Sequence, residues 1–181
     1  MQQSNMRTGF NHRGRALQEF RQFVSLEKRR SSGLSVSEFA TWVELKSRLE
    51  RAFGNSGAPP GASQRATPRV AVALKVNFDA LGSIQSSLIT NLSRGGIFVP
   101  IERPPEIGME LELRIKVEEP VREIRATGVV VSRNVGPDFR LEQKGMGIRF
   151  TKLSDEARKL IDDLYEHESE RHLESNCPED G

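Results

Sequence analysis

Apolar residues in the first third of the chain recur every three or four positions, which is the repeat of one face of a helix. One such run covers residues 15–30, and a second covers residues 35–53 and begins with a capping-box pattern at Ser35. The two runs predict a helical hairpin. Phe39 and Trp42 of the second run are expected to be core residues, because aromatic residues at helical spacing usually pack inside.

The spacing changes to strict alternation after about residue 69, which is typical of strands with one buried face. Glycine, proline and polar residues separate the alternating segments and predict turns. The predicted strands are 70–78, 83–90, 96–99, 110–117, 124–133 and 146–150. Six short strands with regular turns predict a small antiparallel β-barrel closed on itself.

A last helix is predicted after the strands, with Ser154 as its N-cap and acidic residues in its first turn. Its apolar stripe consists of Ala157, Leu160, Ile161, Leu164 and Tyr165. The fold class is therefore mainly β with flanking helices. The predicted organisation is a disordered N-terminus at 1–14, a helical hairpin at 15–53, a flexible linker at 54–64, a barrel domain at 65–173 and an acidic disordered tail at 174–181.

Charge is unevenly distributed, although the net charge of the chain is only +2. Residues 1–53 carry +5, residues 54–152 carry +4 and residues 153–181 carry −7. The basic body suits an anionic partner, but no dense Lys/Arg block favours a nucleic-acid polymer over a small phosphorylated ligand. No apolar run reaches the length of a membrane span or a signal peptide, so we expect a cytoplasmic protein that does not insert into membranes.

Two arginines stand four residues apart where the predicted linker meets the first strand. Arg65 lies on the linker side, whereas Arg69 follows Pro68, whose ring fixes the backbone. Guanidinium groups bind phosphate in a bidentate manner and can also bind the N7 and O6 acceptors of guanine. The pair is therefore a candidate clamp for a guanine nucleotide, although isolated arginine pairs are more often solvated surface charges.

A second segment, residues 91–96 (NLSRGG), is predicted to be a turn between two strands. Asn91 and Ser93 offer short polar side chains that can read a base edge. Gly96 permits close approach of the backbone to a ligand, and Arg94 and Gly95 are secondary candidates. Taken alone, such a segment is more often an ordinary turn.

Together, in this order and with this spacing, the two segments resemble the hallmark of the PilZ family. That hallmark is Arg-x-x-x-Arg before the first strand of a barrel and (Asp/Asn)-x-Ser-x-x-Gly after the second. The resemblance implies that the protein binds cyclic di-GMP as a ligand, with no cofactor. It also implies that Arg65 and Arg69 hold its phosphates and guanine faces, that Asn91 and Ser93 contact a guanine, and that Gly96 lets the backbone approach.

The resemblance implies a receptor that alters contacts with a protein partner, which the sequence does not identify, in motility, pilus or surface-polysaccharide control. The alternative is a PilZ-like adaptor that does not respond to the ligand; retention of both arginines favours binding. Asn91 stands where aspartate is common, and its single acceptor oxygen predicts weaker contact with guanine. An enzyme is not expected, because His12, His167 and His172 have no catalytic or metal-binding residues at suitable spacing.

Overall fold

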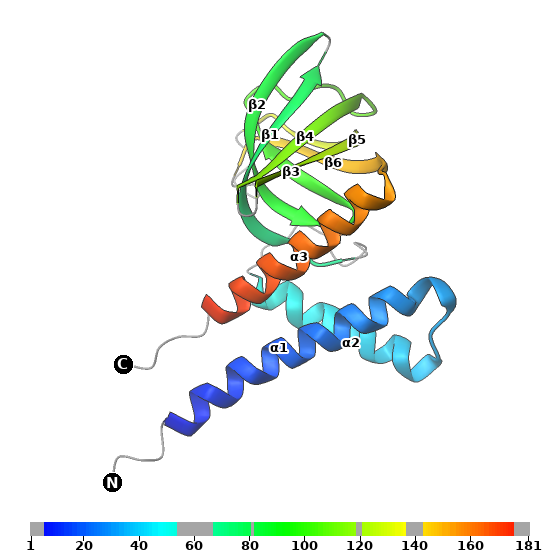
Figure 1. The fold of residues 1–181 in the computed structure, drawn as a ribbon, viewed down its shortest axis with the longest axis vertical. Coiled ribbons are helices and arrows are strands. Elements are labelled where there is room, and N and C mark those ends of the chain that lie inside the picture. The colour runs from blue at the N-terminus through cyan, green and yellow to red at the C-terminus, as the bar shows by residue number, and fades with distance from the viewer. Residues whose placement is uncertain (1–5, 54–66, 81, 119–120, 137–142, 176–181) are drawn as a thin grey trace. The chain divides into compact units, whose positions relative to one another are not determined.

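The computed structural model describes residues 6–53, 67–80, 82–118, 121–136 and 143–175 (Figure 1). Its elements in chain order are α1 (Met6–Arg29), the short 3-10 helix η1 (Arg30–Ser32), α2 (Val36–Ala52), β1 (Val70–Ala80), β2 (Ser83–Ser93), β3 (Gly96–Pro100), β4 (Glu110–Glu118), β5 (Val121–Asn134), β6 (Gly145–Lys152) and α3 (Asp155–Ser175). The chain divides into two compact units. One comprises residues 1–68 and 167–181, and the other comprises residues 69–166.

Both predicted helices of the hairpin are present in the first unit. Helix α1 begins at Met6, not at Arg15 as the apolar spacing predicts, because its first turns carry few of the apolar residues that mark a buried face. Helix α2 begins after Ser35, whose hydroxyl accepts a hydrogen bond from the Glu38 amide while the Glu38 carboxylate accepts one from the Ser35 amide. The predicted capping box is confirmed.

Aromatic side chains form the core of the helical unit. Phe23 stacks on Trp42 at 6.2 Å, and Phe20 meets Phe53 edge to face at 6.4 Å. The Trp42 indole N–H donates to Glu27 at 2.5 Å. The prediction that Trp42 is a core residue is confirmed, whereas the prediction for Phe39 is wrong, since its side chain remains 52% exposed.

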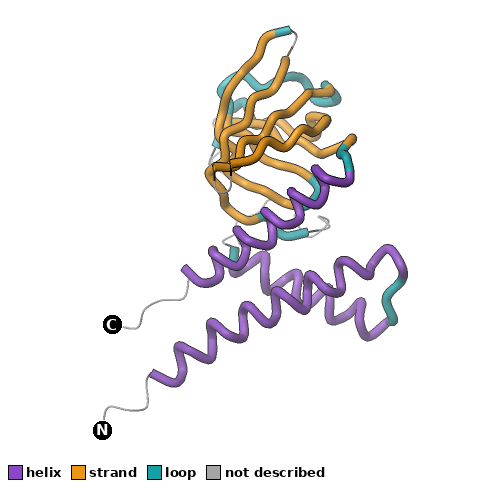
Figure 2. The backbone as a smooth tube through the Cα atoms, in the orientation of Figure 1, coloured by secondary structure: helices purple, strands orange, loops and turns teal. Residues whose placement is uncertain are grey.

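The second unit contains a closed barrel of six antiparallel strands, as the sequence predicts (Figure 2). Around the barrel the strand order is β1, β2, β3, β6, β5, β4, and β4 pairs with β1 to close the ring. Each of the six predicted strands is found at its predicted place, most of them extended by a few residues. In this ring, the β4–β5 strand pair lies opposite the β2–β3 strand pair.

The inner face of the barrel is mostly aliphatic, with Phe78 and Met146 among its buried residues. In β4, Leu111, Leu113 and Ile115 are almost completely buried while their sequence neighbours are exposed, which is the two-residue period of a strand with one core face. The register of β1 on β2 shifts between Ala71 and Leu74, and the alternation changes phase in β2, where Ile89 and Leu92 are both buried. The predicted core face of these strands is confirmed.

Helix α3 begins with the predicted cap, since the Ser154 hydroxyl accepts a hydrogen bond from the Ala157 amide at 3.1 Å. Its buried stripe in the barrel unit consists of Ala157, Ile161 and Tyr165. The helix continues to Ser175, past the predicted start of the acidic tail, and its residues from His167 belong to the helical unit. The predicted linker lies outside the described residues. Within the described ranges, no helix combines the length and apolarity needed to cross a membrane.

Candidate functional site

Asn91 and Ser93 lie at the end of β2, not in a turn as the sequence predicts. Strand pairing continues to the last residue, where Ser93 is opposite Gly96. Only Arg94 and Gly95 are turn residues, because Asn91–Ser93 and Gly96 take part in the pairing of β2 with β3. Leu92 between the two polar residues is buried in the barrel, so Asn91 and Ser93 face outward.

Arg69 is placed beside them by the register of β1 on β2. Val70 pairs with Leu92 and Ala71 pairs with Asn91, so Arg69, which directly precedes β1, is level with Ser93. Val70 is completely buried, and alternation therefore places Arg69 on the outer face. Three of the predicted binding residues share one patch, whereas Arg65 lies outside the described residues.

The side chains of Asn91 and Ser93 each donate a hydrogen bond to a residue nearby in the chain. The Ser93 hydroxyl donates to the Gly96 carbonyl at 3.1 Å, and the Asn91 amide group donates to the Thr90 hydroxyl at 3.5 Å. Within the described residues, no donor reaches the Asn91 side-chain oxygen. Both residues are half-buried, and the Asn91 side-chain oxygen is an acceptor of the kind that can bind a base edge.

Gly96 is required by the packing of the barrel itself. A Cβ on this residue would lie 2.1 Å from the Ile148 carbonyl oxygen of β6. At Gly95, a Cβ would meet nothing within 4 Å. The glycine of the predicted binding segment thus has a structural reason to be there, independent of any approach by a ligand.

Phe98 is a lining residue that the sequence analysis missed. It pairs directly with Asn91, and its alternation with the buried Ile97 and Val99 turns it outward, where it is half-buried. The ring lies over Gly145 of β6, where a Cβ would come within 2.7 Å of it. An outward-facing aromatic residue is therefore the cross-strand neighbour of Asn91, and the alternation around Ile97 was the signal that could have revealed it.

Arg94, a secondary candidate for ligand contact, is engaged with α3. Its guanidinium forms ion pairs with Glu166 at 2.5 Å and Asp162 at 3.6 Å and lies over the Tyr165 ring at 5.6 Å from the centroid. One signal of this arrangement is visible along the chain, since two carboxylates four residues apart share a helix face. It did not indicate which cation they bind.

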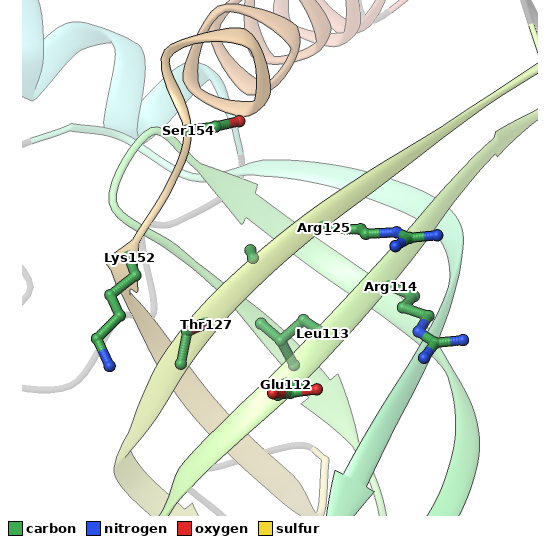
Figure 3. A pocket seen from close by; sticks show the side chains of 8 residues that line it. Glu112, Leu113, Arg114, Arg125, Thr127, Lys152 and Ser154 are labelled. Atoms are coloured by element: carbon green, nitrogen blue, oxygen red, sulfur yellow. The ribbon is translucent and has the colours of Figure 1, made fainter.

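A separate groove of about 320 Å³ lies along β4 and β5 (Figure 3). It is lined by Glu112, Leu113, Arg114, Arg125, Ala126, Thr127, Lys152 and Ser154. Arg114 and Arg125 are directly opposite each other on the two strands. None of the predicted binding residues that the structure describes lines this groove. The described part of the chain also contains no group of three or more His, Cys, Asp or Glu side chains that could hold a metal ion.

Comparison with solved structures finds proteins that share this barrel. The structure of the Bacillus subtilis inhibitor of motility (MotI/DgrA) matches with a TM-score of 0.50 and 22% identity, over 60% of this chain and 51% of that one. The PilZ domain with c-di-GMP of YcgR from Escherichia coli matches with a TM-score of 0.47 and 11% identity, over 59% and 92% of the two chains. The Borreliella burgdorferi PlzA protein in complex with c-di-GMP matches with a TM-score of 0.41 and 20% identity, over 74% and 50%.

The matched part spans about half the length of the Bacillus subtilis protein. At these identities the likeness concerns the fold alone. A search of curated proteins found no match. The family model described as the PilZ domain matches residues 63–167, which is more than half of the chain and includes both predicted binding segments. The chain belongs to the PilZ domain family.

Proposed function

We propose that this protein is a receptor for cyclic di-GMP that transmits ligand occupancy to a protein partner and has no catalytic activity. The observation that carries the proposal is the placement of Arg69, Asn91 and Ser93 on one outer patch. Their chemistry suits the ligand, since a guanidinium binds phosphate or guanine and short polar side chains bind a base edge. Membership of the PilZ domain family supports this assignment of roles.

In the proposed complex, Arg69 and Arg65 hold the phosphates and guanine faces of the ligand. Asn91 and Ser93 form hydrogen bonds with one guanine. To do so, the Ser93 hydroxyl gives up its hydrogen bond to the Gly96 carbonyl. Phe98 provides apolar surface beside Asn91, against which a base can pack. The cationic groups supply most of the binding free energy, because hydrogen bonds to charged groups are about twice as strong as neutral ones.

Motility control is the first output to examine. One structural neighbour is an inhibitor of motility, and we infer a related role from the shared barrel. The proposed output is an altered protein-protein contact, and the proposed location is the cytoplasm. Pilus or surface-polysaccharide control remains the next output to test.

Isothermal titration calorimetry with cyclic di-GMP tests the proposal. We expect the native chain to bind with micromolar or tighter affinity, a free energy of about −8 kcal/mol. Arg69→Ala is expected to lose about 1.5–3 kcal/mol, a weakening of about 10- to 150-fold. Arg125→Ala is the matched control, because Arg125 is exposed on β5, on the opposite side of the ring from β2. This variant should bind the ligand with the affinity of the native chain.

The result that contradicts the receptor proposal is a native chain that neither releases heat nor gains thermal stability at high ligand concentration. The barrel would then serve as an adaptor without ligand response. Equal weakening by Arg69→Ala and Arg125→Ala would indicate general charge attraction in place of a defined site.

A further inference from the structure

The β2–β3 turn and helix α3 are joined by one side chain. Arg94 occupies the first of the two turn residues, between Ser93 and Gly95, and its side chain is only 13% exposed. Its guanidinium reaches Glu166 at 2.5 Å and Asp162 at 3.6 Å. A residue in the middle of the candidate ligand segment is thus directed toward a helix that is distant in the sequence.

On the helix, the contact spans one turn. Asp162 and Glu166 are four residues apart and therefore lie on the same face, and the fully buried Tyr165 lies beneath the guanidinium. Both carboxylate side chains are about one-third exposed, at 32% and 31%. The ion pairs are partly shielded from water, so breaking them on one side only leaves a poorly solvated charge, which is costly.

In the turn, the backbone is held on both sides of Arg94. The Gly95 carbonyl accepts a hydrogen bond from the Phe150 amide at 3.0 Å. The Ser93 hydroxyl donates to the Gly96 carbonyl at 3.1 Å. Because only two residues form the turn, a ligand that draws the Ser93 hydroxyl away from Gly96 must also disturb the backbone that carries Arg94.

The contact also leaves one donor unsatisfied. The Arg94 Nε atom is buried and makes no hydrogen bond within the described residues, because Asp162 is too distant at 3.6 Å. A buried donor without an acceptor is unfavourable. A phosphate that approaches from the Ser93 side can supply the missing acceptor, since guanidinium binds phosphate and carboxylate with the same fork of N–H groups.

We propose that Arg94 is a positioning residue that exchanges partners: it holds α3 in the free protein and releases Asp162 and Glu166 when cyclic di-GMP occupies Asn91 and Ser93. This inference rests on the proposed function. By thermodynamic linkage, a ligand that weakens the Arg94 contact must bind more tightly when that contact is already weakened. The protein partner would then recognise the loosened α3.

The test uses the full chain with Glu166→Gln, which keeps the side-chain shape but removes the charge. We expect cyclic di-GMP to bind Glu166→Gln about fivefold or more tightly than the native chain. In hydrogen exchange, the ligand should speed exchange of the α3 amides 157–166 in the native chain. In Glu166→Gln these amides should exchange fast already, with no further change on ligand addition.

Glu168→Gln is the matched control, because Glu168 forms an ion pair with Arg171 on the same helix and does not contact Arg94. It should keep native affinity and native exchange. If Glu166→Gln does not fold, Asp162→Asn weakens the longer of the two ion pairs and should shift affinity in the same direction by a smaller factor. If both Glu166→Gln and Asp162→Asn bind the ligand no more tightly than the native chain, the proposal that Arg94 exchanges partners is wrong.

A ligand-free measurement separates this inference from the receptor proposal. If the native chain does not bind cyclic di-GMP, the proposed function fails, and so does the ligand-driven release of α3. The contact between Arg94 and α3 can be tested without ligand. Glu166→Gln should speed hydrogen exchange of the turn amides 94–96 relative to Glu168→Gln. Equal exchange of these amides in the two variants would show that α3 does not hold the turn.

Discussion

The barrel and the helical unit bury their apolar residues in different ways, and each arrangement leaves a different surface. Strands such as β4 bury every second side chain and turn the others outward, and Leu92 is likewise buried between Asn91 and Ser93. The helical unit buries an aromatic cluster around Trp42. Many of its charged side chains are paired with one another, as Arg48 is with Glu19 and Glu44.

This difference indicates where chemistry is to be expected. Outward positions on neighbouring strands are held in register by the ladder, so a few polar side chains can form a patch without disturbing the core. In the helical unit, many charged residues form salt bridges with one another, which suits a packing or docking element. The three predictions that follow change the stability of one unit at a time, and the first also tests whether ligand binding by the barrel is independent of the helical unit.

The largest effect is expected for Trp42→Ala. Trp42 is 7% exposed, and truncating a buried aromatic residue typically costs about 3–5 kcal/mol. We expect helical signal in far-ultraviolet circular dichroism to be lost at lower denaturant concentration, with binding of cyclic di-GMP unchanged. Phe39→Ala is the control, since its half-exposed side chain should contribute much less. A Trp42→Ala protein that no longer binds the ligand would break the comparison.

A smaller effect, confined to the barrel, is expected for Gly96→Ala. The added Cβ would lie 2.1 Å from the Ile148 carbonyl oxygen, so β3 must move away from β6 at a cost of about 1–3 kcal/mol. Thermal unfolding measures the change. Gly95→Ala provides the control, because its Cβ would meet nothing within 4 Å. Equal unfolding temperatures for the two variants would contradict the packing reason given for Gly96.

The smallest effect concerns the N-terminus of α2. Hydrogen bonds from the Ser35 amide and hydroxyl, and from Arg29, lower the pKa of Glu38 from 4.5 to about 2. The folded state thus favours the charged carboxylate, and this stabilisation is complete above pH 4.5 and lost as the pH falls toward 2. The difference in melting temperature between the native chain and Glu38→Gln should shrink over that range. A constant difference would show that the charge is not responsible.

Much of the fold could be predicted from the sequence, because the barrel strands alternate clearly and are separated by turn residues. The exposed Phe39 was not predictable, since α2 has apolar residues on two faces and periodicity does not say which face is covered. The extension of β2 through Asn91 and Ser93 depends on the ladder with β3. Polar residues followed by two glycines look the same at the end of a strand as in a turn.

The candidate site was predictable only in part. The spacing of Arg69, Asn91 and Ser93 could be read from the sequence, and the register of β1 on β2 brings them together. The partners of Arg94 could not be identified, because Glu166 is 72 positions away along the chain. Contacts over such separations depend on how α3 packs on the barrel, and the local pattern contains no information about that.

The pairing of β4 with β1 has a consequence for how the barrel can be recognised. At residues 75–79, β1 lies between β2 and β4, so its backbone amides and carbonyls are used on both sides. Among the described residues, β2 pairs with β3 only over Asn91–Ser93, and its residues 83–89 pair with β1 alone. A partner that adds a strand of its own, which is a common way to bind extended peptides, could therefore join only where a strand extends beyond its neighbour. Over the rest of the ring, a partner must recognise side chains on the outer face or on α3, and those few residues will set its specificity.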